Sequence, residues 1–281
     1  MRNFIIRTLT AIVYVALLIG CSIYSPVTSF LFFGIIATAC TWEFSNLVNR
    51  NCGSHVVSPL NGSSAFLLVA SMWLMAIRSD SAPKMFALYS LLLIYLLVSE
   101  LYRKHENPLK NWALTFFSQI YIALPFSLLP LLSVQSNAEG TAPVYSWVYP
   151  LMLFAFIWIN DTGAYLVGMS LRKVFTAKLF PRISPKKSWV GSIGGALLTL
   201  AASALAHHFI PGTFNLWQWM GFALVVVFAG TWGDLVESLI KRQLNIKDSG
   251  SILPGHGGFL DRFDSALLAI PAAIIYFCFA V

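Results

Sequence analysis

Charged residues are scarce in this sequence of 281 residues, of which only 10% are Asp, Glu, Lys or Arg. Apolar residues make up 58% of the chain, and the mean hydropathy is +0.74. This composition is too apolar for one or two soluble domains, because such domains need a more polar surface. The apolar residues instead fall in long runs. They predict an all-α polytopic membrane protein, since helices satisfy every backbone polar group inside a bilayer.

Paired cysteines and several common catalytic motifs are also missing. The four cysteines are scattered and mostly lie within apolar runs, without CxxC or Cys/His spacing; they are Cys21, Cys40, Cys52 and Cys278. We interpret them as small core residues, which excludes a disulfide framework and a zinc site. The sequence contains neither a GxxxxGK[ST] phosphate loop nor a GxSxG nucleophile motif.

Nine apolar runs have about the length needed to cross a bilayer as helices, roughly 20 residues. They cover about 4–24, 27–48, 57–77, 85–102, 112–134, 147–169, 189–210, 216–240 and 264–281. The third run is interrupted by the sequence Pro-Leu-Asn-Gly at 59–62. We treat the chain as one integral membrane domain, 1–281. Residues 1–146 form N-terminal scaffold helices, and residues 147–281 form a C-terminal catalytic half.

Lysine and arginine set the predicted orientation. With a cytoplasmic N-terminus and nine spans, 16 of the 18 Lys and Arg fall on the inner side, and only Arg78 and Lys84 fall outside. The positive-inside rule therefore predicts a cytoplasmic N-terminus and an outer C-terminus in the inner, or plasma, membrane. The net charge of +7 then suits anionic lipid headgroups and nucleotide phosphates. A nucleic-acid partner is not needed to explain it.

Three polar segments interrupt the runs. Two lie in the C-terminal half, at about 170–188 and 241–263, and are predicted to be cytoplasmic. The third, 135–145, is predicted to be an unstructured outer loop. Acidic residues in or beside the spans converge on the inner half of the bilayer, which favours a cavity open to the cytosol over a transport path. Two of them, Glu43 and Glu100, are interpreted as mainly structural.

The richest polar segment extends from Asp234 to Asp264. Asp234, Glu237, Ser238 and Lys241 share one face of a predicted helix, and Asp261 shares a face with Asp264. Two such helix ends suit a hard divalent cation, because Mg²⁺ is usually held by one or two carboxylates with waters and substrate phosphates. The alternative is ion pairing without a metal, from Asp234 to Lys241 or from Asp261 to Arg262.

Two loops contain candidate phosphate ligands. Gly257 and Gly258 allow close backbone approach to a phosphate, and we expect His256 to contact the same group. A packing role for His256 is the alternative. The turn at Ser184, Lys186 and Lys187 suits a triphosphate or an acidic lipid headgroup, although these lysines also fit a purely topological role.

The segment from Ser238 to Asp264 resembles the signature of the phosphatidate cytidylyltransferases, S-x-x-K-R-x4-K-D-x-[GSA]-x2-[LIF]-[PG]-x-H-G-G-hydrophobic-x-D-R-hydrophobic-D, at every position. The elements Asp161–Tyr165, Ser184–Lys187 and Trp42–Phe44 are similar as well, so the resemblance covers nearly the whole chain. One departure is Asn245, where glycine is common; asparagine also tolerates left-handed backbone.

The resemblance implies transfer of CMP from CTP to phosphatidic acid, which gives CDP-diacylglycerol and pyrophosphate. The implied metal ligands for Mg²⁺ are Asp234, Asp261 and Asp264, with a second cation helped by Asp264 or Asp248. Implied contacts to the triphosphate are Lys241, Arg242, Lys247 and Arg262. Ser184, Lys186 and Lys187 are then expected at the lipid headgroup or the pyrophosphate, and acyl chains remain among membrane lipids. A homodimer is expected from the resemblance alone.

Two other functions stay open at this point. A CTP-dependent lipid kinase of the polyprenol or phytol type would use a similar charged cluster but transfer the γ-phosphoryl group to an alcohol. A transporter for a phosphorylated metabolite or an ion is the alternative outside the enzymes, and the uncharged outer half of the spans counts against it.

Overall fold

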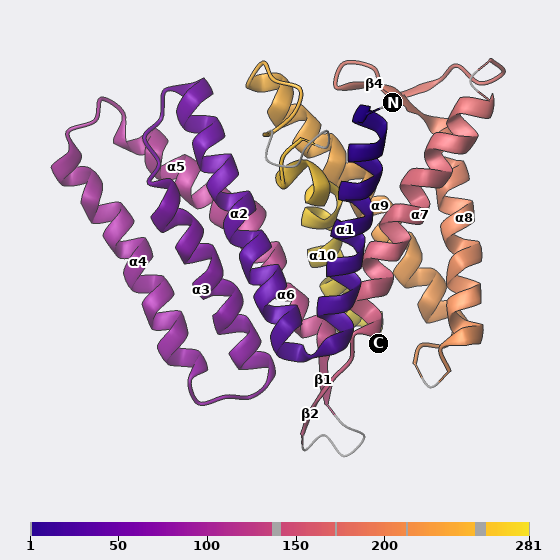
Figure 1. The fold of residues 1–281 in the computed structure, drawn as a ribbon, viewed down its shortest axis with the longest axis horizontal. Coiled ribbons are helices and arrows are strands. Elements are labelled where there is room, and N and C mark those ends of the chain that lie inside the picture. Colours follow the sequence, from indigo (N-terminus) through magenta and orange to yellow (C-terminus); the bar gives the residue numbers. More distant parts are fainter. Residues whose placement is uncertain (1, 137–141, 172, 212, 251–256, 281) are drawn as a thin grey trace. The chain divides into compact units, whose positions relative to one another are not determined.

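The computed structural model describes residues 2–136, 142–171, 173–211, 213–250 and 257–280, with side chains from residue 10 onward (Figure 1). The chain divides into two compact units. One contains 1–149 with 244–263, and the other contains 150–243 with 264–281. The loop 244–263 therefore groups with the N-terminal helices, whereas the sequence assigned it to the C-terminal half. That the chain forms one integral domain stays a prediction.

The first unit is built mainly from helices. In order, these are α1 (Arg2–Tyr24), α2 (Pro26–Cys52), α3 (Ser58–Ala76), α4 (Ala82–Arg103), α5 (Pro108–Ser118), the π-helical turn η1 (Gln119–Ala123) and α6 (Leu124–Ser133). Helix α3 packs between α2 and α4 (Figure 1). Two short strands, β1 (Val134–Ser136) and β2 (Pro143–Tyr145), follow α6.

The second unit contains most of α7 (Val148–Leu171), the strands β3 (Lys178–Phe180) and β4 (Ser184–Ser188), α8 (Trp189–Phe209), α9 (Leu216–Gln243) and most of α10 (Leu260–Ala280). Glycines allow α7 and α8 to pack closely. A Cβ at Gly195 would lie 2.5 Å from the Asn160 carbonyl oxygen, and one at Gly191 would lie 2.7 Å from that of Ala164. Small residues at a helix interface are typical of membrane bundles.

Eight helical segments among the described residues are long and apolar enough to cross a membrane; α5, η1 and α6 together form one of them, Pro108–Ser133. Helix α1 adds a shorter described apolar stretch, Thr10–Tyr24. The all-α polytopic membrane class is confirmed. The exact number of crossings and the orientation of the termini stay predictions.

The expected interruption at 59–62 does not break α3. Pro59 lies in the first turn, where its missing N–H would have no partner inside the helix. The Asn61 side-chain amide donates to Ser45 Oγ at 2.9 Å and to Ser118 Oγ at 2.7 Å, so this polar group is satisfied although it is fully buried. A turn-like sequence is thus accommodated inside a spanning helix.

The expectation of an unstructured segment at 135–145 is wrong for its ends. Antiparallel pairing joins Val134 to Tyr145, Gln135 to Val144 and Ser136 to Pro143. The Tyr145 hydroxyl also donates to the Ser22 carbonyl at 2.6 Å. These contacts hold the ends of the segment although its composition is typical of a loop.

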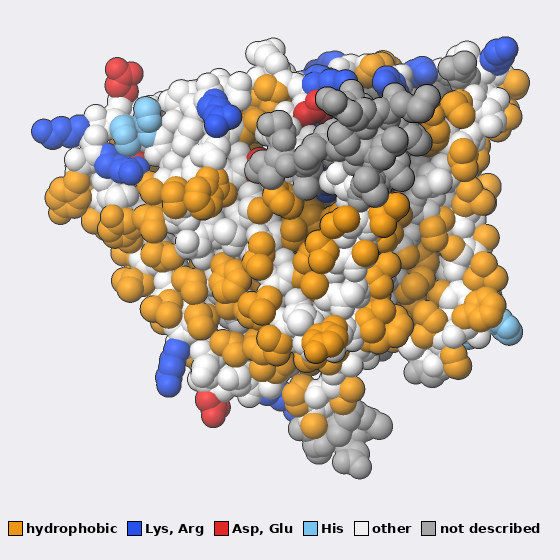
Figure 2. All heavy atoms as spheres, viewed as in Figure 1, with side chains coloured by type: hydrophobic (Ala, Val, Ile, Leu, Met, Phe, Trp, Pro, Cys, Tyr) orange, Lys and Arg blue, Asp and Glu red, His pale blue; other side chains and the backbone are white. Residues whose placement is uncertain are grey.

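Helix α4 illustrates the lipid-facing surface of the first unit. Most of its exposed side chains are large and apolar: Phe86, Leu88, Leu91, Ile94, Tyr95, Val98, Leu101 and Tyr102. Hydrophobic side chains cover much of the face shown in Figure 2. Only 11% of the most apolar 18-residue stretch of this helix is buried in the protein. Such a surface would be unfavourable in water, and we interpret it as contacting lipid.

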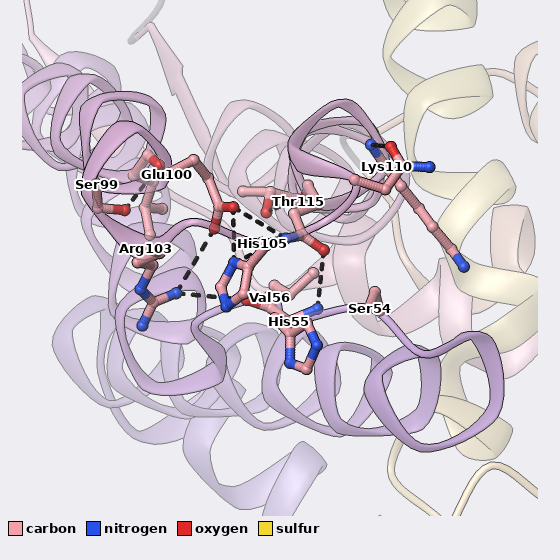
Figure 3. A network of polar contacts seen from close by, with 12 residues as sticks. Ser54, His55, Val56, Ser99, Glu100, Arg103, His105, Lys110 and Thr115 are labelled. Carbon is pink, nitrogen blue, oxygen red and sulfur yellow. Dashed lines mark hydrogen bonds and ion pairs between the residues drawn. The ribbon is translucent and has the colours of Figure 1, made fainter.

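A polar network joins the end of α4 to α5 and to the loops that precede α5 and α3 (Figure 3). The buried Glu100 carboxylate accepts from Asn111 at 3.0 Å, lies 2.9 Å from His105 Nδ1 and pairs with Arg103 at 3.6 Å. The His55 and His105 rings stack with centroids 4.4 Å apart. This geometry supports the structural role expected for Glu100.

Candidate active site

A pocket of about 610 Å³ with five charged residues in its lining lies in the second unit. Carboxylates enter it from α7 and α9, and lysines enter it from β3 and β4; the charged residues are Asp161, Lys178, Lys186, Lys187 and Asp234. The pocket combines groups that attract phosphates with groups that attract cations. Lys178 was not among the residues singled out from the sequence, where only its charge marked it.

Asp234 is the best-connected carboxylate in this pocket. Its Oδ2 lies 2.6 Å from Lys187 Nζ, and its Oδ1 accepts from Ser238 Oγ at 3.1 Å. The side chains of Asp234 and Lys187 are 28% and 25% exposed, so both remain accessible from the pocket. The alternative pairing of Asp234 with Lys241 is not what the structure shows, because Lys241 pairs with the buried Glu237 one turn earlier.

Asp264 follows the first turn of α10 and belongs to the second unit, where it lies near the same pocket carboxylates. A Cβ at Gly233 would lie 2.7 Å from the Asp264 carbonyl oxygen, so α9 and α10 approach closely beside Asp234. Asp264 interacts electrostatically with Asp234, Glu237 and Asp161. Its Oδ1 also accepts from the Ser265 N–H at 2.6 Å.

The donors of this pocket fit a hard cation. In the described part of the chain, no three Asp, Glu, His or Cys side chains group closely enough to hold a metal by themselves. Mg²⁺ does not need three, because one or two carboxylates with waters and substrate phosphates complete its octahedron. The partly exposed Asp234 carboxylate at the pocket wall meets that requirement.

Ser184–Lys187, predicted as a turn, instead form most of strand β4, and the hairpin of β3 and β4 positions them. Phe180 pairs with Ser184 and Lys178 with Ser188. Ser188 also caps α8, accepting from the Gly191 N–H at 3.2 Å. Lys186 is exposed, Lys187 is half-buried and both line the pocket, whereas Ser184 does not line it. Arg242 Nε reaches the Ile183 carbonyl at 3.5 Å, so it lies against this hairpin.

Asp261 belongs to the first unit and organises the loop that precedes α10. Its Oδ2 accepts from the Ser249 N–H at 2.9 Å and from the Gly258 N–H at 2.8 Å. Gly257 has φ +82°, a conformation that favours glycine, and a Cβ there would meet Asp261. This N–H of Gly258 is therefore used within the loop. Phosphate contacts of Gly257 and Gly258 stay predictions.

Glu43 of α2 binds the same loop, although the sequence indicated only a mainly structural role for it. The side chain is only 6% exposed and accepts hydrogen bonds from Ser249 Oγ, from the Phe259 N–H at 2.8 Å and from the Leu260 N–H at 3.3 Å. Its position in the Trp42–Phe44 element and its predicted place at the inner end of a span were the available signals, because no spacing rule relates residues this distant in sequence.

Gly258 is predicted to be intolerant of a side chain. An added Cβ would overlap the Glu43 carboxylate and Ser249 Oγ, so Gly258→Ala must displace the loop. We expect a loss of about 1–3 kcal/mol in stability, typical of overpacking. Thermal unfolding in detergent measures this, with Gly20→Ala as control, because a Cβ at Gly20 has nothing within 4 Å. Equal melting temperatures for the two variants would contradict the prediction.

The remaining predicted site residues lie along the segment 244–263. Lys247, Asp248 and Arg262 are exposed. His256 lies outside the described residues. Asn245 adopts φ 56°, so it takes the left-handed conformation expected from the sequence. Asp261 and these loop residues belong to one unit, and Asp234, Lys241, Arg242 and Asp264 belong to the other.

Comparison with known proteins gives one consistent result. Residues 5–280 match the model of the cytidylyltransferase family. The phosphatidate cytidylyltransferase of Staphylococcus aureus (strain COL) is 32% identical over 272 residues, which cover 95% of this chain and 96% of that protein. The phosphatidate cytidylyltransferases of Staphylococcus haemolyticus and Staphylococcus epidermidis are 31% and 30% identical over the same shares. With its pocket of lysines and carboxylates set among membrane-spanning helices, the chain belongs to the cytidylyltransferase family and is a nucleotidyltransferase.

Proposed function

We propose that this enzyme transfers CMP from CTP to phosphatidic acid and releases pyrophosphate and CDP-diacylglycerol. The observation that carries the proposal is the pocket in which Lys178, Lys186 and Lys187 lie beside Asp161 and Asp234. The names of the relatives support the substrates. The helices with apolar outer faces support a lipid acceptor, because its acyl chains can remain in the bilayer.

The proposed reaction forms one bond and breaks one. A phosphate oxygen of phosphatidic acid attacks the α-phosphorus of CTP in line, and the bond from that phosphorus to the bridging oxygen of the β-phosphate breaks. Pyrophosphate leaves with the electron pair. The second pKa of a phosphate monoester is about 6, so the attacking group is already largely ionised at neutral pH. No general base is required.

The main barrier in such a reaction is repulsion between two anions. Lysines of the β3–β4 hairpin lower this repulsion, and we assign Lys186 and Lys187 to the lipid headgroup or the pyrophosphate. Lys241, Arg242, Lys247 and Arg262 are assigned to the charge that develops on the triphosphate, and His256, Gly257 and Gly258 to a phosphate contact. Preorganised positive groups of this kind commonly supply the largest part of catalysis.

Mg²⁺ is proposed as the cofactor, with Asp234, Asp261 and Asp264 as its carboxylate ligands and Asp248 available for a second cation. When bound, Mg²⁺ neutralises phosphate charge and orients the leaving group. In this structure the Lys187 ammonium pairs with the Asp234 carboxylate. We also propose that the site faces the cytoplasm, where CTP is present, and that the protein lies in the inner membrane as the charge distribution predicts. A homodimer stays a prediction from the resemblance.

Positional labelling of CTP tests the proposed reaction. Purified enzyme in mixed micelles receives phosphatidic acid, Mg²⁺ and CTP labelled at either the α- or the γ-phosphorus. We expect the α-label in lipid and the γ-label in pyrophosphate. In a parallel reaction with diacylglycerol or a polyprenol as the acceptor, transfer of the γ-label to the lipid would instead identify a kinase. Omission of Mg²⁺ with a chelator is expected to stop the transfer.

A further inference from the structure

We infer that Glu43 is a positioning residue for the reaction: it fixes the loop that leads into the first turn of α10, where Asp261 lies, although Glu43 belongs to a helix near the other end of the chain. This inference rests on the proposed function for its catalytic meaning. The contacts that carry it all lie within the unit formed by 1–149 and 244–263.

The Glu43 carboxylate is buried among backbone donors. Only 6% of the residue is exposed, and its two oxygens accept from Ser249 Oγ and from the N–H groups of Phe259 and Leu260. A buried carboxylate is costly unless hydrogen bonds replace its water shell. The Phe259 and Leu260 N–H groups lie at the start of α10, where backbone donors have no partner within the helix. A negative charge there also interacts favourably with the helix dipole.

The loop is shaped to receive this carboxylate. A Cβ at Gly258 would overlap the Glu43 oxygens, and one at Gly250 would lie 3.0 Å from them. At Gly258 the backbone of the loop therefore approaches Glu43 more closely than a side chain would allow, whereas Gly250, at a position where the signature also accepts Ser or Ala, makes a tight contact only. Both glycines belong to the signature segment. The contact between this segment and Glu43 on α2 explains why Gly258 has no side chain.

Ser249 connects Glu43 to Asp261. Its hydroxyl donates to Glu43, and its N–H donates to Asp261 Oδ2. Asp261 also holds the Gly258 N–H, next to the Phe259 N–H that Glu43 holds. The Glu43 carboxylate on α2 and the Asp261 carboxylate in the first turn of α10 thus both accept hydrogen bonds from the same segment, through Ser249 and residues 258–259. Without Glu43, the segment that Asp261 binds loses three hydrogen bonds that hold it against α2.

Phe263 anchors the same turn by apolar packing. It is 1% exposed, and its ring makes edge contacts with Tyr14 at 5.6 Å and with Phe126 at 5.3 Å between centroids. This anchor does not depend on Glu43. The loss of Glu43 is therefore expected to loosen the loop locally rather than to unfold the unit.

Hydrogen exchange on the full chain in detergent tests this inference, with Glu43→Ala compared with Glu100→Ala. The two glutamates are matched, because each is 6% exposed and each lies in the same unit, but Glu100 bonds to the α4–α5 region instead of the loop. In Glu43→Ala we expect faster exchange in the peptides that contain Ser249 and Phe259, with α3 and α4 unchanged. In Glu100→Ala we expect faster exchange in the peptides at the end of α4 and the start of α5, with unchanged exchange in the peptides that contain Ser249 and Phe259.

Turnover provides the second measurement. Removing groups that orient ligating residues typically costs about 10- to 100-fold in activity, and we expect Glu43→Ala to lose kcat in that range. Glu100→Ala, assayed well below its unfolding temperature, should retain kcat within a few-fold. Should Glu43→Ala fail to fold, Glu43→Gln, which keeps the side-chain size and one acceptor oxygen, takes its place with the same expected pattern.

The outcomes separate this inference from the proposed function. Exchange that is unchanged at the loop, or raised equally throughout the unit, would overturn the positioning role whatever the activity. Faster exchange confined to the loop with normal kcat would also overturn it. A wild-type enzyme that transfers no α-label would overturn the proposed function, whereas the exchange data would still report whether Glu43 holds the loop.

Discussion

Asp261→Asn is expected to lower CMP transfer by about 100- to 1000-fold, because it removes a carboxylate proposed to hold the Mg²⁺ that would stabilise the charge developing on the phosphates. The asparagine retains one side-chain oxygen, which can still accept from the N–H groups of Ser249 and Gly258. The change therefore removes the charge while the loop keeps its two backbone bonds. Turnover with α-labelled CTP measures the loss, and the melting temperature in detergent should shift little.

Asp80→Asn is the matched control for this substitution. Asp80 is an exposed carboxylate in the same unit and has no assigned role in the site, so its replacement should leave turnover unchanged. Near-normal activity of Asp261→Asn would refute the assignment of Asp261 as a metal ligand. A large drop in melting temperature would instead show that Asp261 mainly stabilises the loop.

The second large effect is expected at the ion pair of Lys187 and Asp234. Asp234→Asn should reduce kcat by about 100- to 1000-fold, because it removes a negative group from the pocket that we assign to the cation. Lys187→Met should also lower activity, since it removes a positive group proposed to contact the lipid phosphate or pyrophosphate. Each single variant is expected to lose some stability as well, because the remaining partner keeps its charge in a partly desolvated pocket.

The double variant distinguishes a structural pair from two functional residues. Lys187→Met with Asp234→Asn removes both charges, so it should regain part of the stability that either single variant loses. If the pair were only structural, activity would recover with stability. We expect activity to stay lost. Lys173→Met is the control, because Lys173 is exposed in the same unit and does not line the pocket.

Local sequence rules predicted much of this molecule correctly. The apolar runs gave the positions of the spanning helices, because crossing a bilayer imposes a minimum length and composition that is visible in the sequence. Asn245 took the left-handed conformation that its residue type allows. The same rules failed at 59–62, where a turn-like composition lies inside α3. Ser45 and Ser118 satisfy Asn61 there, and neither is local to it.

For the charged residues too, the sequence predicted contacts within one helix correctly but missed a contact between elements. Helical spacing correctly grouped Asp234 with Ser238 and Glu237 with Lys241, which are each four residues apart. It also suggested an ion pair between Asp234 and Lys241, but Asp234 pairs with Lys187 of the β3–β4 hairpin. A periodicity identifies residues on one helix face, whereas the partner from another element depends on how the elements pack.

The sequence by itself determined the membrane class, the family and the segment from Ser238 to Asp264 that carries most of the candidate residues. These properties depend on composition and on short-range spacing, both of which are written along the chain. Only the tertiary structure decided that Glu43 holds the signature loop, across 206 residues to Ser249. It also decided that Gly258 must lack a side chain, because the group that would meet that side chain is this distant carboxylate. Contacts of this kind are fixed by packing, and no local rule contains them.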